Sequence, residues 1–204
     1  MKRSISRFIA LIAALVLAQA GFARPRIGEK APDFTATDSN GKTQRLSDYA
    51  GKIVVLEWHN RGCPYTQKHY KSGNMQSLQK KWTEQGVVWF TVISSAPGKQ
   101  GYVTAAEENA FVNEIHASPT AVLLDPTGQL GHLYDAKTTP QIVVINKDRL
   151  VVYDGAIDDR PTTDVSDIAG ARNYADLALA EVTAGKPVSV AVTRPYGCSV
   201  KYPN

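Results

Sequence analysis

Cysteine is scarce in this chain, and the positions of the few cysteines exclude two common kinds of site. Cys63 and Cys198 are the only two among 204 residues, and they lie 135 positions apart. A local dithiol site would need a second sulfur three positions after the first, and Thr66 stands there. No paired-cysteine spacing suited to a zinc site occurs either. Any cysteine chemistry must therefore use a lone thiol or two thiols brought together by the fold.

The N-terminal segment has the pattern of an export signal. Lys2, Arg3 and Arg7 form a basic start, the run FIALIAALVLA is apolar, and the segment ends with AQA at Ala20. Such an arrangement is typical of a secretory signal peptide, and the run is too short for a confident membrane span. We expect residues 1–20 to be the signal, with cleavage after residue 23 and an uncleaved anchor as alternatives. We therefore predict an exported protein, periplasmic or secreted, with no stable membrane span after cleavage.

The chain that remains after the expected signal has no strong net charge of either sign. The chain has 23 basic and 19 acidic residues, and three of the basic ones lie in the signal, which leaves 20 against 19. A net charge near +1 gives no reason to expect nucleic acid or an anionic membrane as a partner.

Strand-like and helix-like segments alternate along residues 21–204, without internal repeats or low-complexity tracts. Apolar runs at 53–58, 87–93 and 121–125 predict buried strands, and 141–146 with 150–157 predict a strand pair joined by a tight turn. Helices are expected over 64–85, with a break at 72–74, from the capping-box pair Thr104 and Glu107, and over 174–185. We predict one α/β domain whose mixed sheet has helices on both faces, with a core of about 27–184 and a C-terminal tail, 185–204.

Cys63 lies where a predicted central strand gives way to a helix, with Pro64 at the first helical position. The free amides of a first helical turn and the helix dipole favour negative charge, so the pKa of a cysteine there should fall. The thiolate is the reactive species in disulfide exchange and in peroxide reduction. This position favours a reactive thiol over a buried inert cysteine or half of a static disulfide.

Three motifs resemble the thioredoxin-fold redoxins, the broad group that holds alkyl hydroperoxide reductase, thiol-specific antioxidant and thioredoxin-like exported oxidoreductases. They are KAPDF at 30–34, VVLEW running into GCPY at 54–65, and TTPQIVVI at 138–145, and the resemblance covers roughly residues 27–184. It implies a thioredoxin-like fold. It also implies that Thr139-Pro140 matches the family's cis-proline, which faces the active cysteine and offers backbone to a substrate. Without the resemblance, Pro140 would be taken for an ordinary trans loop proline.

Glu57 and the departures from the family pattern qualify this resemblance. Glu57 is similar to a buried acidic residue of thioredoxins that assists proton transfer, and burial would raise its pKa; a glutamate facing water at a strand edge is the alternative. Thr66 replaces the second motif cysteine, so a local dithiol cycle is impossible. The peroxiredoxin pattern Pro-x-x-x-Thr-x-x-Cys is also absent, since Leu56 and Asn60 stand at those places. Asn60 and Thr66 remain candidate hydrogen-bond donors to a thiolate or a bound oxidant.

Cys198 is the candidate that would complete the cycle, because its Pro/Gly-containing tail could fold back onto Cys63. A permanent Cys63–Cys198 staple and a remote Cys198 are the alternatives. His59 and His69 near Cys63 raise the question of copper or zinc, but a core or surface histidine is the more ordinary interpretation, and no metal is predicted.

The sequence thus predicts a thiol oxidoreductase that acts by disulfide exchange or hydroperoxide reduction. Cys63 would be the nucleophile, Glu57 the proton carrier and Cys198 the resolving residue, while Pro64, Thr66, Asn60, Thr139 and Pro140 would form the substrate site. No cofactor is required, and electrons would come from a thiol protein or a small thiol. The alternative is a non-enzymatic binding or metal-delivery module with a structural disulfide.

Overall fold

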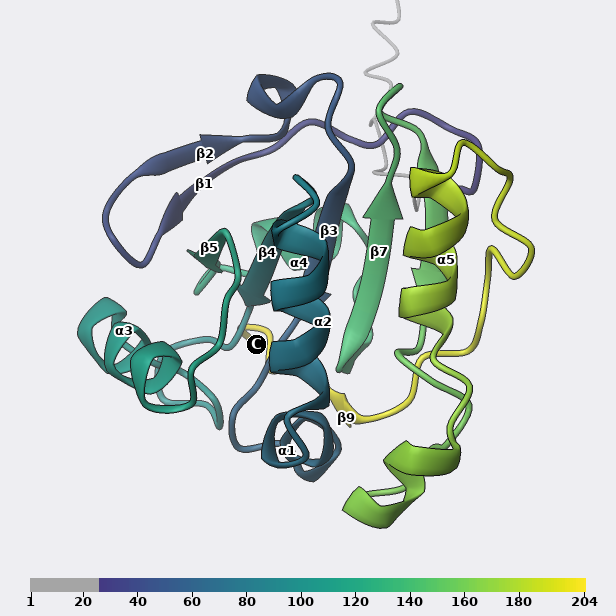
Figure 1. Cartoon of the computed structure of the whole chain (residues 1–204). Coiled ribbons are helices and arrows are strands. Elements are labelled where there is room, and N and C mark those ends of the chain that lie inside the picture. The colour runs from purple at the N-terminus through teal and green to yellow at the C-terminus, as the bar shows by residue number, and fades with distance from the viewer. Residues whose placement is uncertain (1–25) are drawn as a thin grey trace, which may run out of the picture.

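A mixed seven-stranded sheet organises residues 26–204, the part of the chain that the computed structural model describes (Figure 1). The signal peptide expected in residues 1–20 lies outside this part. The strand order is β2-β1-β5-β4-β3-β7-β8. The bounds are β1 Thr35–Asp38, β2 Thr43–Arg45, β3 Val54–Trp58, β4 Val88–Ile93, β5 Ala121–Leu124, β7 Gln141–Ile145 and β8 Val151–Gly155.

Parallel and antiparallel pairs share this sheet, as predicted. Strand β3 pairs in parallel with β4, and β4 with β5, whereas β3–β7 and β7–β8 are antiparallel. Strands β3 and β4 are apolar apart from a few positions and buried along their whole length, as expected for strands covered on both faces. The N-terminal hairpin β1–β2 joins the sheet through an antiparallel pair with β5.

Helices cover both faces of the sheet, as predicted. Helix α1 begins at Pro64 and ends at Lys71, and α2 follows over Asn74–Thr83. The expected break falls at Gly73, whose φ of 74° is left-handed and suits glycine. The other helices are α3 Ala105–Glu114, capped by Thr104 and Glu107 as predicted, α4 Gln129–Leu133 and α5 Tyr174–Thr183; short 3-10 helices span Leu46–Tyr49 and Val165–Gly170.

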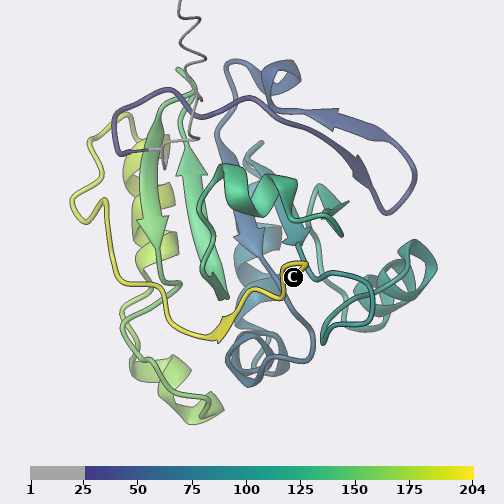
Figure 2. The same ribbon diagram turned by 180° about the vertical axis from the view of Figure 1, so that it is seen from behind.

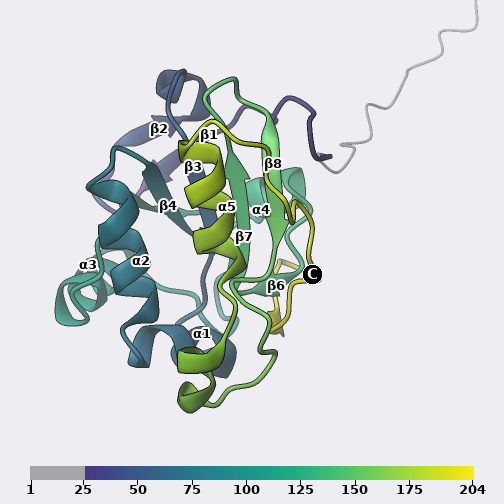
Figure 3. The same cartoon turned by 45° about the vertical axis from the view of Figure 1, so that its right-hand side comes forward.

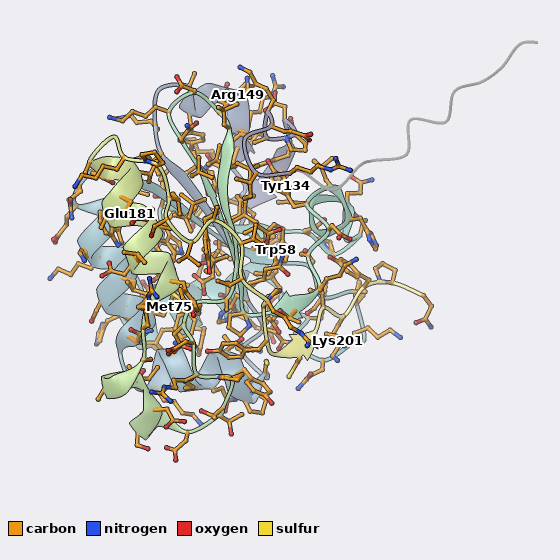
Figure 4. All side chains as sticks on the ribbon, turned by 90° about the vertical axis from the view of Figure 1, so that its right-hand side faces the viewer. Trp58, Met75, Tyr134, Arg149, Glu181 and Lys201 are labelled. Carbon is orange, nitrogen blue, oxygen red and sulfur yellow. The ribbon has the colours of Figure 1, made fainter. Side chains whose placement is uncertain are left out.

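Alternate side chains of β3 pack into two separate apolar layers, one on each face of the sheet. Val54, Leu56 and Trp58 join the layer that includes Tyr134, which directly follows α4, while Val55 joins the layer that includes Met75 of α2. Figure 4 shows Met75 and Tyr134 on opposite sides of the sheet. Because successive side chains of a strand point to opposite faces, Glu57 must enter the Met75 layer.

The C-terminal tail crosses the lower end of the sheet instead of hanging free (Figures 2 and 3). Strand β9, Cys198–Ser199, pairs antiparallel with β6, Thr138–Thr139, and Thr139 lies opposite Cys198. Beyond it, Val200 is buried in the Tyr134 layer, and the Tyr202 hydroxyl donates to the Ala136 carbonyl at 2.8 Å. The tail is therefore part of the folded domain.

Within residues 26–204, the structure contains no helix that is both long and apolar enough to cross a membrane.

Candidate functional site

Cys63 is the N-cap of α1, five residues after Trp58, the last residue of β3 that pairs with β4. The loop between them is held by Asn60, whose carbonyl accepts from the Cys63 amide at 2.9 Å and whose side-chain Oδ1 accepts from the Gly62 amide at 2.9 Å. Pro64 occupies the first helical position, where a missing N–H breaks no helical bond. The predicted strand-to-helix junction is thus present.

The fold brings the two cysteines together. Cys63 Sγ lies 2.7 Å from Cys198 Sγ, although 135 positions separate them in the sequence. Cys63 is fully buried, while Cys198 is half-buried. Of the alternatives considered for Cys198, the structure excludes a remote position.

The environment of Cys63 favours its thiolate. Burial alone would raise the pKa of Cys63, but hydrogen bonds outweigh it. They come chiefly from the Cys198 thiol and from the backbone amides of Thr66 and Cys198, so the pKa is lowered. The same pairing works in the opposite direction on Cys198, whose pKa is raised to about 11 by burial and by its contact with Cys63. The two thiols are therefore unequal: Cys63 ionises first, and Cys198 stays a hydrogen-bond donor.

Thr139 and Pro140 face Cys63 from the far side. The peptide bond between them is cis, and the Cys63 thiol lies 3.0 Å from the Thr139 carbonyl oxygen, which can accept its hydrogen bond. The Thr139 hydroxyl is buried without a hydrogen-bond partner. This edge of backbone is the one that pairs with Cys198.

Two predicted donors, Asn60 and Thr66, are used differently from what the sequence suggested. The Asn60 amide donates to the Gln100 carbonyl at 3.3 Å and so supports the loop. Thr66 reaches Cys63 with its backbone amide, while its buried hydroxyl has no hydrogen-bond partner.

Glu57 is fully buried, which excludes the water-facing alternative. It accepts from Tyr70 Oη at 2.7 Å, Trp89 Nε1 at 2.8 Å, Gln79 Nε2 at 3.1 Å and Thr91 Oγ1 at 3.3 Å. Burial raises the pKa of Glu57 despite these four donors. Among the described residues, no direct hydrogen bond joins Glu57 to Cys63, so any proton transfer between them is indirect.

The nearby histidines are buried and neutral. Burial, with help from the positive charge of Arg61, lowers the pKa of His59 to about 3, and both of its ring nitrogens lack hydrogen-bond partners. Burial likewise lowers the pKa of His69 to about 4. Over residues 26–204, no group of three or more His, Cys, Asp or Glu side chains is arranged to hold a metal ion.

Sequence reasoning missed a polar cluster that surrounds Tyr196, two residues before Cys198. Tyr196 Oη donates to Asp158, and it lies 3.2 Å from His69 Nε2 and 3.4 Å from Lys68 Nζ. The signal available in the sequence was the adjacent Lys68-His69 pair on a helix that opens at the cysteine. A cleft of about 610 Å³ adjoins this cluster, and its walls include Tyr65, Thr138 and Gly197.

Curated relatives carry names of thiol redox enzymes. Peroxiredoxin Bcp of Bacillus subtilis is 27% identical over 113 residues, which cover 53% of this chain and 63% of that protein. Thiol-disulfide oxidoreductase ResA of Bacillus thuringiensis is 27% identical over 128 residues, which cover 63% of this chain and 68% of ResA. The chain thus spans roughly two thirds of the length of these relatives.

Solved structures share the fold. A hypothetical protein of Sinorhizobium meliloti superposes with a TM-score of 0.73 at 20% identity, covering 89% of this chain and 97% of that one. A candidate thiol:disulfide interchange protein DsbE of Chlorobium tepidum has a TM-score of 0.51 at 25% identity, covering 64% and 84%.

These findings define the class as a thioredoxin-like α/β protein with a cysteine at the strand-to-helix junction, as predicted. A family model matches residues 27–154, and the chain belongs to the AhpC/TSA family.

Removing the Cys198 thiol should raise the pKa of Cys63, because that thiol is the strongest of the hydrogen-bond donors to the Cys63 thiolate. Titration of thiolate absorbance near 240 nm in reduced Cys198→Ala should give a higher midpoint than in Cys198→Ser, which keeps a hydroxyl donor. Equal midpoints in the two variants would contradict this account.

Burial of His59 should make stability depend on pH. Its folded pKa of about 3 lies below the unfolded value near 6.5. The unfolded chain therefore binds the extra proton, and stability is lost as pH falls below about 6.5. Between pH 7.5 and 4.5 this costs up to about 3 kcal/mol. Urea unfolding of His59→Phe should show a smaller loss over this range, whereas His116→Asn, at an exposed histidine, should match the original protein. An unchanged loss in His59→Phe would contradict the assignment.

Proposed function

We propose that this protein is an exported thiol-dependent oxidoreductase in which Cys63 is the nucleophile and Cys198 the resolving cysteine. The observation that carries the proposal is the 2.7 Å approach of the two sulfur atoms across 135 positions. The unequal pKa values support the division of roles, because the thiol that ionises first attacks first. The N-terminal signal pattern supports export.

In the hydroperoxide branch, the Cys63 thiolate attacks the terminal peroxide oxygen, the O–O bond breaks, and the alcohol leaves after taking up a proton. Cys63 becomes a sulfenic acid. The Cys198 thiol then displaces the hydroxyl group as water, and a Cys63–Cys198 disulfide forms. Two thiols of an external reductant restore both cysteines and are themselves oxidised to a disulfide.

In the exchange branch, the Cys63 thiolate attacks a substrate disulfide and releases one substrate thiolate. The resulting mixed disulfide is attacked at the Cys63 sulfur by Cys198, which releases the second substrate thiol. Both branches end in the same internal disulfide and need the same reductant class, a thiol protein or a small thiol. The names of the relatives, peroxiredoxin and thiol-disulfide oxidoreductase, correspond to the two branches.

The remaining predicted residues have supporting parts in the proposal. The backbone of Thr139-Pro140 would position the partner, which is supported by its contact with the Cys63 sulfur. Pro64 and the Thr66 amide would hold the thiolate at the helix start. Asn60 would shape the loop that carries Cys63. Glu57 would act as a buried proton acceptor behind the site, which its raised pKa suits.

Intact-mass measurement under non-reducing conditions should show an internal disulfide in the oxidised chain. We expect a loss of two hydrogens, about 2 Da, that a dithiol reductant reverses, and no such loss in Cys63→Ser or Cys198→Ser. Turnover of a hydroperoxide or of a model disulfide, with a dithiol as the electron source, should disappear in Cys63→Ser. Without added reductant, Cys198→Ser should perform one stoichiometric reaction at Cys63 and then stop.

Two outcomes would overturn the proposal. A disulfide that resists reductant until the protein unfolds would favour the non-enzymatic module with a structural staple. Turnover that persists in Cys63→Ser would place the chemistry elsewhere. To distinguish the two branches, peroxide consumption and disulfide reduction are measured separately, and each is compared with the Cys63→Ser variant.

Glu57→Gln should alter the pH profile of the reaction more than the ionisation of Cys63. The amide oxygen can still accept from Trp89, Gln79 and Thr91 and the amide N–H can donate to Tyr70 Oη, but the amide cannot take up a proton. We expect slower turnover with a flatter pH dependence, while the thiolate titration of Cys63 stays close to that of the original protein. An unchanged pH profile would remove Glu57 from the mechanism.

A further inference from the structure

The last segment of the chain is docked beside Cys63 as a short strand. Strand β9 pairs with β6 so that Thr139 lies opposite Cys198 and Thr138 opposite Ser199. The Val200 amide extends the contact by donating to the Lys137 carbonyl at 3.1 Å. In Figure 2 the tail runs across the end of the sheet to reach this position. The register of this pairing decides which tail residue meets Cys63.

Gly197 permits the close approach. Its φ is 143°, and a Cβ built there would lie 2.1 Å from the Thr139 carbonyl oxygen, inside the backbone of the facing strand. Backbone cannot give way as a flexible side chain can, so a side chain at 197 would push the tail off β6. The oxygen involved is the same one that lies 3.0 Å from Cys63 Sγ.

Tyr196 provides a second point of attachment, on α1. His69 Nδ1 lies 2.9 Å from Asn74 Nδ2, which can only donate, so the ring proton is on Nε2 and points to Tyr196 Oη. Tyr196 in turn donates to Asp158. Lys68 Nζ lies 3.5 Å from the other Asp158 oxygen and donates to the Arg160 carbonyl at 2.5 Å.

Almost all of this cluster is removed from water. The side chains of Lys68, His69 and Asp158 are each at most 2% exposed. Lys68 and His69 belong to the helix that Cys63 caps, so the cluster fixes the tail to the same rigid element that carries the nucleophile.

We propose that Tyr196, held by Lys68, His69 and Asp158, and Gly197, closing on Thr139, are positioning residues that set the tail register and so make Cys198 the resolving partner of Cys63. This inference rests on the proposed two-cysteine cycle. The attachment raises the effective concentration of Cys198 at Cys63. Cys198 can thereby act as the second cysteine that the local motif lacks. It also covers Cys63, so a substrate reaches that sulfur only when the tail detaches.

The test measures the Cys63–Cys198 disulfide equilibrium of the full chain against oxidised and reduced dithiothreitol. In this exchange one internal disulfide and one dithiol give two protein thiols and one cyclic disulfide. Tyr196→Phe should make the disulfide about tenfold easier to reduce, equal to about 30 mV, because the hydrogen bond to a buried carboxylate is lost. Gly197→Ala should show an effect at least as large.

A second readout separates positioning from a general loss of stability. In a Cys198→Ser background, where Cys63 is the only thiol, the tail variants should let iodoacetamide alkylate Cys63 about tenfold faster under native conditions. Matched controls are Tyr102→Phe, at an exposed tyrosine, and Gly170→Ala, where a Cβ would meet nothing within 4 Å. Both controls should leave the equilibrium and the alkylation rate unchanged.

The outcomes distinguish the two proposals. If the original protein forms no internal disulfide, the two-cysteine cycle fails, and this inference fails with it. If the disulfide forms normally but Tyr196→Phe and Gly197→Ala change neither the equilibrium nor the alkylation rate, only the positioning role is overturned. Equal changes in the control variants would also overturn it.

Discussion

The contact between the Cys63 sulfur and the strand pair β6–β9 is the constraint on which the rest of the site depends. It places the Cys198 thiol and the backbone amides of Thr66 and Cys198 around the Cys63 sulfur at the start of a helix. The hydrogen bonds of this arrangement outweigh the cost of burying a charge, which is why Cys63 is acidic although no solvent reaches it. A buried sulfur without those donors would remain a neutral, inert thiol.

Most of the fold could be predicted from the sequence, because its signals are local. The apolar runs of β3 and β4, the Thr104–Glu107 capping box and the left-handed Gly73 each act within a few residues. The position of Cys63 at a helix start followed from Pro64 in the same way. The mixed character of the sheet followed from the short connection between β7 and β8, which allows only an antiparallel pair.

The sequence named Cys198 as the candidate partner of Cys63 but could not choose between a meeting and a remote position, because the meeting depends on contacts between distant segments. The tail is fixed by Gly197 against Thr139, by Tyr196 against α1 and by Val200 in the apolar layer, and none of these pairs leaves a periodic pattern. The burial of Glu57 could be predicted only in part, because its place within an apolar run was compatible with either a buried or a water-facing glutamate. The four side chains that donate hydrogen bonds to the buried Glu57 carboxylate come from other elements of the fold.

The place of Cys198 after every strand of the seven-stranded sheet has a consequence for biosynthesis. Chains are made from the N-terminus onward, so the scaffold that holds Cys63 exists before its redox neighbour has been synthesised. During that interval Cys63 has neither the covering strand nor the sulfur-bound proton that favours its ionisation. The nascent chain is therefore less acidic at Cys63 but more open to foreign disulfides, and a cycle that uses both cysteines becomes possible only when the final segment has docked.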